Sequence, residues 1–90
     1  MLVAYLNDWY LGTVTNKDPI QKTLTVNFLH PKGPSKSFKY PDKEDVLDEI
    51  PFSDVLVKVE ATTATGRAYK VDEKSQQRAT RLIKQRVDTS

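Results

Sequence analysis

The side chains of this chain best suited to chemistry are its aromatic rings, of which there are eight in 90 residues. An exposed ring on a small domain can anchor a peptide, a methylated cation or a stacked base. The simpler alternative is that the rings fill the core, which applies to Phe28 and Phe52 especially. Strand alternation puts Trp9 and Tyr10 on opposite faces, so at least one is expected at the surface or its rim. The candidate peptide-binding residues are Tyr5, Trp9, Tyr10, Phe28 and Tyr40.

The single histidine, His30, begins the sequence His30-Pro31-Lys32-Gly33-Pro34, which predicts a rigid loop. A histidine can transfer protons, but no cysteine or second histidine accompanies it. Backbone hydrogen bonding or solvent exposure is therefore the simpler interpretation. The acidic run at 42–49 is explained by a solvated turn, since a metal site needs three or four ligands close together. Isolated glycines cannot form a phosphate-binding loop. The sequence predicts a protein that is not an enzyme and has no metal or cofactor.

Basic residues are the second group that could bind a ligand. The formal net charge is only +2, but residues 61–90 contain seven basic and three acidic residues, whereas residues 1–60 contain seven lysines and nine acidic residues. A solvated lysine face is the simpler interpretation. The alternative is that these cations contact nucleic-acid phosphates. The candidate nucleic-acid-binding residues are Lys32, Lys36, Lys39, Arg67, Lys70, Arg78 and Arg81.

Composition indicates one soluble domain with a modest core, because 38% of the residues are hydrophobic and 29% are charged. No apolar run approaches the roughly 18 residues that a membrane span needs, and no secretory signal is visible. The chain has no cysteine, which excludes disulfides and thiolate metal sites. We therefore expect an intracellular protein with no membrane partner.

The clearest strand that could position these residues is 22–29, in which Leu24, Val26 and Phe28 alternate with polar residues. Period-2 alternation of this length indicates a half-buried strand whose apolar set faces the core. The expected core therefore consists of Leu24, Val26, Phe28, Val55, Val57 and Val59.

Further strand-like runs and turns predict an antiparallel, mainly β domain over residues 1–71. Residues 2–6 form a short leading strand or cover one end, and residues 16–19 form a turn. The remaining predicted strands are residues 9–15, 36–40, 46–50 and 55–60. Between the last two, Pro51 begins a single helical turn, because it has no N–H to offer a ladder. This order is that of a small five-stranded SH3-like barrel.

A C-terminal basic helix is predicted within residues 72–90, capped by Asp72 or Ser75 and running to about residue 87. Its narrow apolar stripe is too small to be buried on all sides, and an isolated helix of this length is marginal in water. We expect its first half to dock on the barrel and its end to fray after Gln85. Self-association is the alternative, so the chain is expected to be a monomer or a weak homodimer. The stripe consists of Ala79, Leu82, Ile83 and Val87.

Two strands and the helical turn together resemble a Tudor-type SH3-like barrel over about residues 3–60. The first strand has a Trp-Tyr pair followed by a small residue and a valine, at 9–14, and the second has the alternating run at 24–28. In Tudor domains an aromatic cage binds methylated lysine or arginine. Carried over by position, the resemblance places Tyr10 and Phe28 in such a cage. Val3 and Pro31 stand near the positions of other cage rings, and Tyr5 could replace one of them.

A second resemblance is to uncharacterised animal proteins with transposon-associated relatives. These contain the motif H-P-x-G-P-x-x-S-F, found here at 30–38, and T-T-x-T-G-R-x-Y, found here at 62–69. The resemblance implies no assigned chemistry. It implies that the loop and the threonine-rich segment belong to the domain.

The leading hypothesis is a non-catalytic interaction module that recognises a protein peptide, on chromatin or in a nuclear complex. A basic or methylated peptide would suit Asp8, Asp42 and Asp45 by charge complementarity. Nucleic-acid binding through the lysine-rich loop and the basic helix is the alternative.

Overall fold

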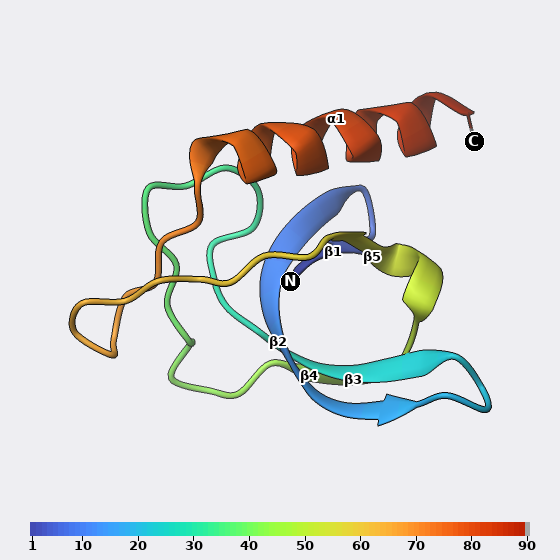
Figure 1. Ribbon diagram of the computed structural model, residues 1–90, viewed down its shortest axis with the longest axis horizontal. Coiled ribbons are helices and arrows are strands. Elements are labelled where there is room, and N and C mark those ends of the chain that lie inside the picture. Colours follow the sequence, from blue (N-terminus) through green and yellow to red (C-terminus); the bar gives the residue numbers. More distant parts are fainter. Residues whose placement is uncertain (90) are drawn as a thin grey trace.

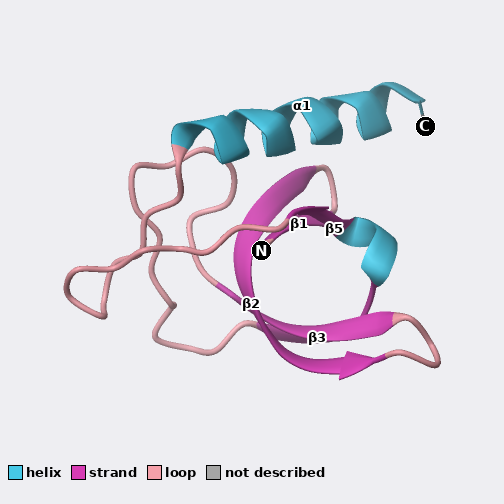
Figure 2. Cartoon of the chain, viewed as in Figure 1, coloured by secondary structure: helices cyan, strands magenta, loops and turns pink. Residues whose placement is uncertain are grey.

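Five antiparallel strands and one C-terminal helix form the chain in a computed structural model, which describes residues 1–89 and the side chains of residues 1–86 (Figure 1). The strands lie side by side in the order β4-β3-β2-β1-β5, and the sheet curves strongly along its length (Figure 2). A single 3₁₀ turn, η1, joins the two edge strands. The elements are β1 (Leu2–Tyr5), β2 (Asp8–Asp18), β3 (Thr23–Phe28), β4 (Val46–Pro51), η1 (Phe52–Asp54), β5 (Val55–Val57) and α1 (Glu73–Thr89).

The β2–β3 hairpin confirms the clearest predicted strand and corrects its neighbour. Along β3, Leu24, Val26 and Phe28 are buried while the intervening side chains are partly exposed. The predicted turn at 16–19 is wrong, because β2 continues past a bulge and pairs to Asp18. The chain reverses just beyond, where the Asp18 carboxylate accepts the N–H groups of Ile20 and Gln21. An aspartate that bonds nearby backbone in this way favours a turn after it, not at it.

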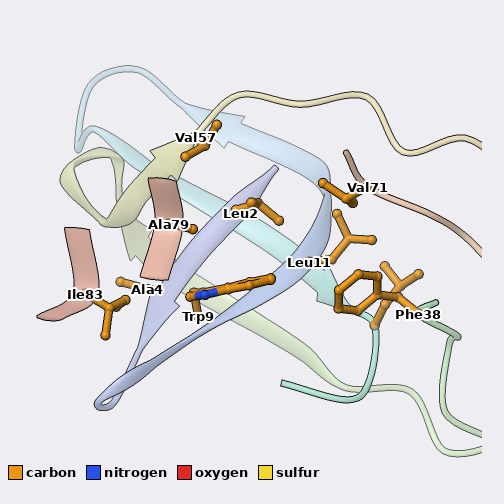
Figure 3. Close-up of a cluster of buried hydrophobic side chains, with 10 residues drawn as sticks. Leu2, Ala4, Trp9, Leu11, Phe38, Val57, Val71, Ala79 and Ile83 are labelled. Carbon is orange, nitrogen blue, oxygen red and sulfur yellow. The ribbon is translucent and has the colours of Figure 1, made fainter. Parts of the chain in front are cut away.

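The first strand is a full member of the sheet and is buried on both faces. Leu2 and Ala4 point to one side and Val3 to the other, as period-2 geometry requires. The sheet therefore separates two cores. The helix-facing cluster contains Leu2, Ala4, Trp9, Leu11, Leu29, Phe38, Val57, Val71, Ala79 and Ile83 (Figure 3). The inner cluster contains Val3, Leu24, Val26, Phe28 and Ile50.

The expected single core is thus divided between the two clusters. Val57 is buried in the helix-facing cluster, and Val59 packs against it half-buried. Val55 packs against the inner cluster. The last strand is also shorter than predicted, since β5 ends at Val57.

The predicted strand at 36–40 is wrong. Phe38 forms one isolated bridge with Tyr69, and Lys39 forms another with His30, so no continuous ladder develops. Proline supplies no N–H and restricts the residue before it, and three prolines bracket this stretch, at positions 31, 34 and 41. The five strands of the structure therefore include residues 2–5 in place of 36–40. The prediction of a mainly β chain with a C-terminal helix is confirmed.

Helix α1 begins where Asp72 caps it. The Asp72 carboxylate accepts the Ser75 N–H at 2.9 Å and the Ser75 hydroxyl at 2.8 Å. The Ser75 hydroxyl, followed by the Ser75 N–H, holds the pKa of Asp72 below its ordinary value. The bond from the Ser75 N–H satisfies one of the backbone donors that have no partner within the helix.

Docking of the helix on the sheet is confirmed. Ala79 is fully buried and Ile83 is nearly so in the helix-facing cluster. The predicted fraying after Gln85 is wrong, because α1 continues to Thr89 and Arg86 Nη2 lies 2.8 Å from Asp54 Oδ1. The Val87 side chain, predicted to complete the apolar stripe, lies outside the described residues. The division into 1–71 and 72–90, and a monomeric or weakly dimeric state, stay predictions.

Candidate functional site

Three aromatic side chains and one imidazole gather at the point where β1 and β3 end. We call Tyr5, Tyr10, Phe28 and His30 the aromatic cluster. The ring centroids of Tyr5 and Tyr10, and of Tyr5 and Phe28, are 6.0 Å apart. Tyr10 lies 5.4 Å from Phe28 and 5.7 Å from His30, each with an edge-on geometry. Spacings and tilts of this kind are those that aromatic pairs favour.

Strand register brings these rings together. Tyr10 lies opposite Val3, two residues before Tyr5, so the two tyrosines lie on one face of the β1–β2 pair. Phe28 lies opposite Gly12, two residues after Tyr10. Gly12 must lack a side chain here, because an added Cβ would lie 2.4 Å from Val26 Cγ1. The bare backbone at this position therefore leaves room for the Val26 side chain, with Phe28 beside it.

Exposure differs among the members of the aromatic cluster. Phe28 is buried and belongs to the inner cluster, whereas Tyr10 is half-buried and packs against it. Tyr5 is 40% exposed, and the His30 side chain is 45% exposed. The cluster therefore has a buried floor, Phe28, and three rings that reach solvent. Phe28 was predicted to contact a peptide; its burial makes it a support for the contacting rings.

Asp45 adds a carboxylate to the edge of the aromatic cluster. Its Oδ2 lies 2.8 Å from His30 Nε2, and its side chain is 39% exposed. The Asp45 carbonyl also accepts the N–H of Phe28 at 2.8 Å. This bond holds the segment just before β4 against the end of β3. The imidazole is thus oriented by a partner fifteen residues away. Asp45 retains enough exposure to attract a cation.

Two predicted peptide-binding residues lie elsewhere. Trp9 is 1% exposed beneath the helix, and its Nε1 donates to Thr80 Oγ1 at 3.0 Å. The prediction that Trp9 contacts a peptide is therefore wrong. Tyr40 is exposed, but its ring packs edge-on against Tyr69 at 5.7 Å and its hydroxyl lies 2.6 Å from Thr13 Oγ1. Tyr40 lies outside the aromatic cluster.

His30 is the member of the cluster that sequence reasoning did not select. It lies two residues beyond Phe28, so extended backbone through the end of β3 puts both side chains on one face. That spacing was a usable signal. The contact between His30 and Asp45 had no comparable signal, because it depends on how two loops approach each other.

The predicted nucleic-acid-binding residues are divided among several places. Lys36, Lys70 and Arg81 line one open groove of about 970 Å³ between the 34–36 loop and α1. Arg78 faces away from it and lines a second cavity of about 580 Å³. The others are exposed on loops: Lys32, Lys39 and Arg67.

Within the described part of the chain, no group of three or more His, Cys, Asp or Glu side chains could hold a metal ion. The described helices include none with the length and apolar character needed to cross a membrane.

Comparison with protein-family models, with curated proteins and with solved structures finds no match for this chain. The assignment of a function therefore depends on the geometry of its own residues.

Proposed function

We propose that this chain is a non-catalytic peptide-recognition module in which the aromatic cluster binds a basic or methylated side chain. The observation that carries this proposal is the convergence of Tyr5, Tyr10 and His30, all reaching solvent, beside the carboxylate of Asp45. Aromatic faces attract a cation by about 0.5–2 kcal/mol, more where water is excluded. The Asp45 carboxylate adds a charge of the opposite sign to that of the ligand.

The buried floor supports this function because it fixes the rings before a ligand arrives. Phe28 contacts both tyrosines, and His30 is held by Asp45. Binding to groups that are already in place loses little conformational entropy. A long methylated lysine side chain fits such a surface well, since its ammonium lies over the rings while its stem remains near solvent.

We also propose that the curved sheet is an SH3-like barrel of the Tudor type. The support is the topology: the last strand, β5, follows a single 3₁₀ turn and returns to pair with β1. The position of Tyr10 and Phe28 in contact agrees with the cage positions that the Tudor resemblance implies. The proposed partner is a peptide on chromatin or in a nuclear complex, and the proposed location is therefore nuclear.

A peptide array that contains unmodified and lysine-methylated sequences tests the proposal, followed by titration of the best peptide. Replacing Tyr5 with alanine should weaken binding roughly 5- to 30-fold, which corresponds to the loss of about 1–2 kcal/mol. Tyr40→Ala is the matched control, because Tyr40 is 39% exposed against 40% for Tyr5 but lies outside the cluster. Equal losses in the two variants, or no binding anywhere by the folded protein, would overturn the proposal.

Nucleic-acid binding is the second candidate, and the gathering of Lys36, Lys70 and Arg81 at one groove favours it. Nucleic-acid binding should weaken steeply as the salt concentration rises, because each phosphate contact releases counterions. Labelled single-stranded DNA and RNA titrated at two salt concentrations would test it. Absence of binding even at low salt excludes this function.

A further inference from the structure

The groove between the 34–36 loop and α1 is a second surface that could bind a ligand, separate from the aromatic cluster. We call it the basic groove and define it by Pro34, Lys36, Lys70, Gln76, Arg81 and Lys84. One wall comes from residues 34–36 and 70–71, and the other comes from helix α1. Neither the aromatic cluster nor Asp45 contributes a residue to the lining of the basic groove.

The basic groove is held in shape by one buried glutamine. Gln76 Oε1 accepts the Ser35 N–H at 3.0 Å, and Gln76 Nε2 donates to the carbonyls of Ser35 and Val71 at 2.9 and 3.0 Å. With Gln76 only 9% exposed, these bonds fasten the loop to the first turns of the helix. The groove is therefore formed before any ligand binds, which lowers the entropy lost on binding.

The charges of the groove are unbalanced. Lys36 and Lys70 stand on the loop wall, while Arg81 and Lys84 stand three residues apart on the helix wall. Among the described side chains, none of these four cations forms an ion pair with a carboxylate. Glu73 is the acidic residue of the lining. Two cationic walls of this kind complement a ligand with several negative charges.

Between the charged walls, most of the exposed lining surface is carbon, and no lining residue is aromatic. Pro34, Val71 and the aliphatic stems of the lysines contribute carbon surface. Nucleic-acid bases would find no aromatic side chain to stack on, and stacking supplies much of the affinity for single strands. A peptide that combines acidic and aliphatic side chains would use both the walls and the apolar lining.

We propose that the basic groove binds an acidic peptide segment that contains an aliphatic side chain. The helix between Glu73 and Lys84 is about 16 Å long at 1.5 Å per residue. An extended peptide rises about 3.3 Å per residue, so about five residues span the groove. The module would then hold a cationic peptide at the aromatic cluster and an anionic one at the basic groove.

The probe for this proposal is a fluorescein-labelled pentapeptide, Asp-Glu-Leu-Asp-Glu, measured by anisotropy with the full chain. Two peptide controls separate the contributions: Asn-Gln-Leu-Asn-Gln removes the charge, and Asp-Glu-Gly-Asp-Glu removes the aliphatic group. Both should bind more weakly than the probe. Equal binding of the glycine peptide would show a merely electrostatic association and would overturn the proposed apolar contact.

Charge reversal on two faces of the same helix supplies the protein control. The double substitution R81E/K84E should reduce affinity for the probe roughly tenfold or more. The substitution K74E/R78E changes the net charge equally but lies outside the groove lining, so it should change affinity by less than about threefold. Circular dichroism is the check that both variants fold.

Three outcomes would overturn the proposal. The first is no binding of the probe by the wild-type chain, and the second is an equal loss in both double variants. The third is a single-stranded oligonucleotide of five nucleotides that displaces the probe and binds more tightly through Arg81 and Lys84, which would make nucleic acid the ligand. Tyr5→Ala should leave probe affinity unchanged, so this test is independent of the aromatic cluster.

Discussion

The aromatic cluster and the basic groove lie in one small domain but are built by different means. Strand register alone places Tyr5, Tyr10 and Phe28 in contact. Each of these residues lies in a strand that pairs with its neighbour in the sheet. The groove exists only because a helix is docked over the sheet and one glutamine fastens a loop to it. The comparison indicates that the first surface should survive perturbations of the helix, whereas the second should not.

The largest expected effect comes from Trp9, which supports the docked helix. Trp9 is almost fully buried in the helix-facing cluster (Figure 3). Its Nε1 donates a hydrogen bond to Thr80 Oγ1. Replacing it with alanine should lower the free energy of unfolding by about 3–5 kcal/mol, a large fraction of the stability of a small domain. Urea denaturation followed by circular dichroism measures this change.

Trp9→Phe is the control, because it keeps a ring in the cluster but removes the Nε1 donor. The loss of unfolding free energy in Trp9→Phe should be well below that in Trp9→Ala. The folded Trp9→Phe variant should keep its affinity for a methyl-lysine peptide. Its affinity for the acidic probe should fall further than its affinity for the methyl-lysine peptide. Equal losses of affinity for the acidic probe and for the methyl-lysine peptide would contradict the structural independence of the basic groove and the aromatic cluster.

The contrast also explains which parts of the fold could be predicted. Alternation over β3 is a local property, so Leu24, Val26 and Phe28 were placed correctly. The same reasoning put Trp9 and Tyr10 on opposite faces, but it could not say which face a helix would cover. Nothing near Trp9 in the sequence encodes a contact with Thr80, 71 residues away.

The segment around Phe38 was misread for a related reason. Phe38 and Tyr40 alternate like strand residues, yet Phe38 is buried against the helix side while Tyr40 bonds Thr13. An alternating sequence pattern reflects which side chains are buried. A buried side chain on a loop can produce the same pattern although the backbone forms no strand pairing. Gln76 was missed entirely, since a glutamine on a basic helix gives no sign that it is buried among backbone groups.

Gln76 provides the second prediction, which separates the two surfaces most sharply. Its replacement by alanine leaves the Ser35 N–H and two carbonyls without their partner, so unfolding free energy should fall by about 1–3 kcal/mol. The 34–36 loop is then no longer fastened to the helix. Amide hydrogen exchange at Ser35 should accelerate, while exchange at Phe28 should stay slow.

Gln77→Ala is the matched control, because Gln77 is the exposed neighbour of Gln76 on the same helix. It should change neither stability nor exchange by more than a few tenths of a kcal/mol. The idea of a fastened groove fails if Gln76→Ala leaves exchange at Ser35 as slow as in the wild type.

The smallest expected effect concerns the helix cap and its response to acid. The Ser75 hydroxyl and N–H hold the pKa of Asp72 below its ordinary value of 3.8, so the folded state favours the charged carboxylate. The stability that this adds is fully present above the unfolded pKa and is lost as pH falls through the lower folded pKa. Asp72→Asn keeps an oxygen acceptor but removes the charge.

We therefore expect the wild type to have a higher urea midpoint than Asp72→Asn at neutral pH, and the difference to close as the pH falls below about 3.8. Ser75→Ala removes the main cause of the lowered pKa, so the stability of this variant should fall less between neutral and acid pH than that of the wild type. Because Asp72 adjoins Val71 and the Gln76 contacts, acid should weaken binding of the amide probe Asn-Gln-Leu-Asn-Gln with an amidated C-terminus, whose side chains do not titrate. A difference between wild type and Asp72→Asn that stays constant down to pH 2 would show that the cap acts through geometry and not through its charge.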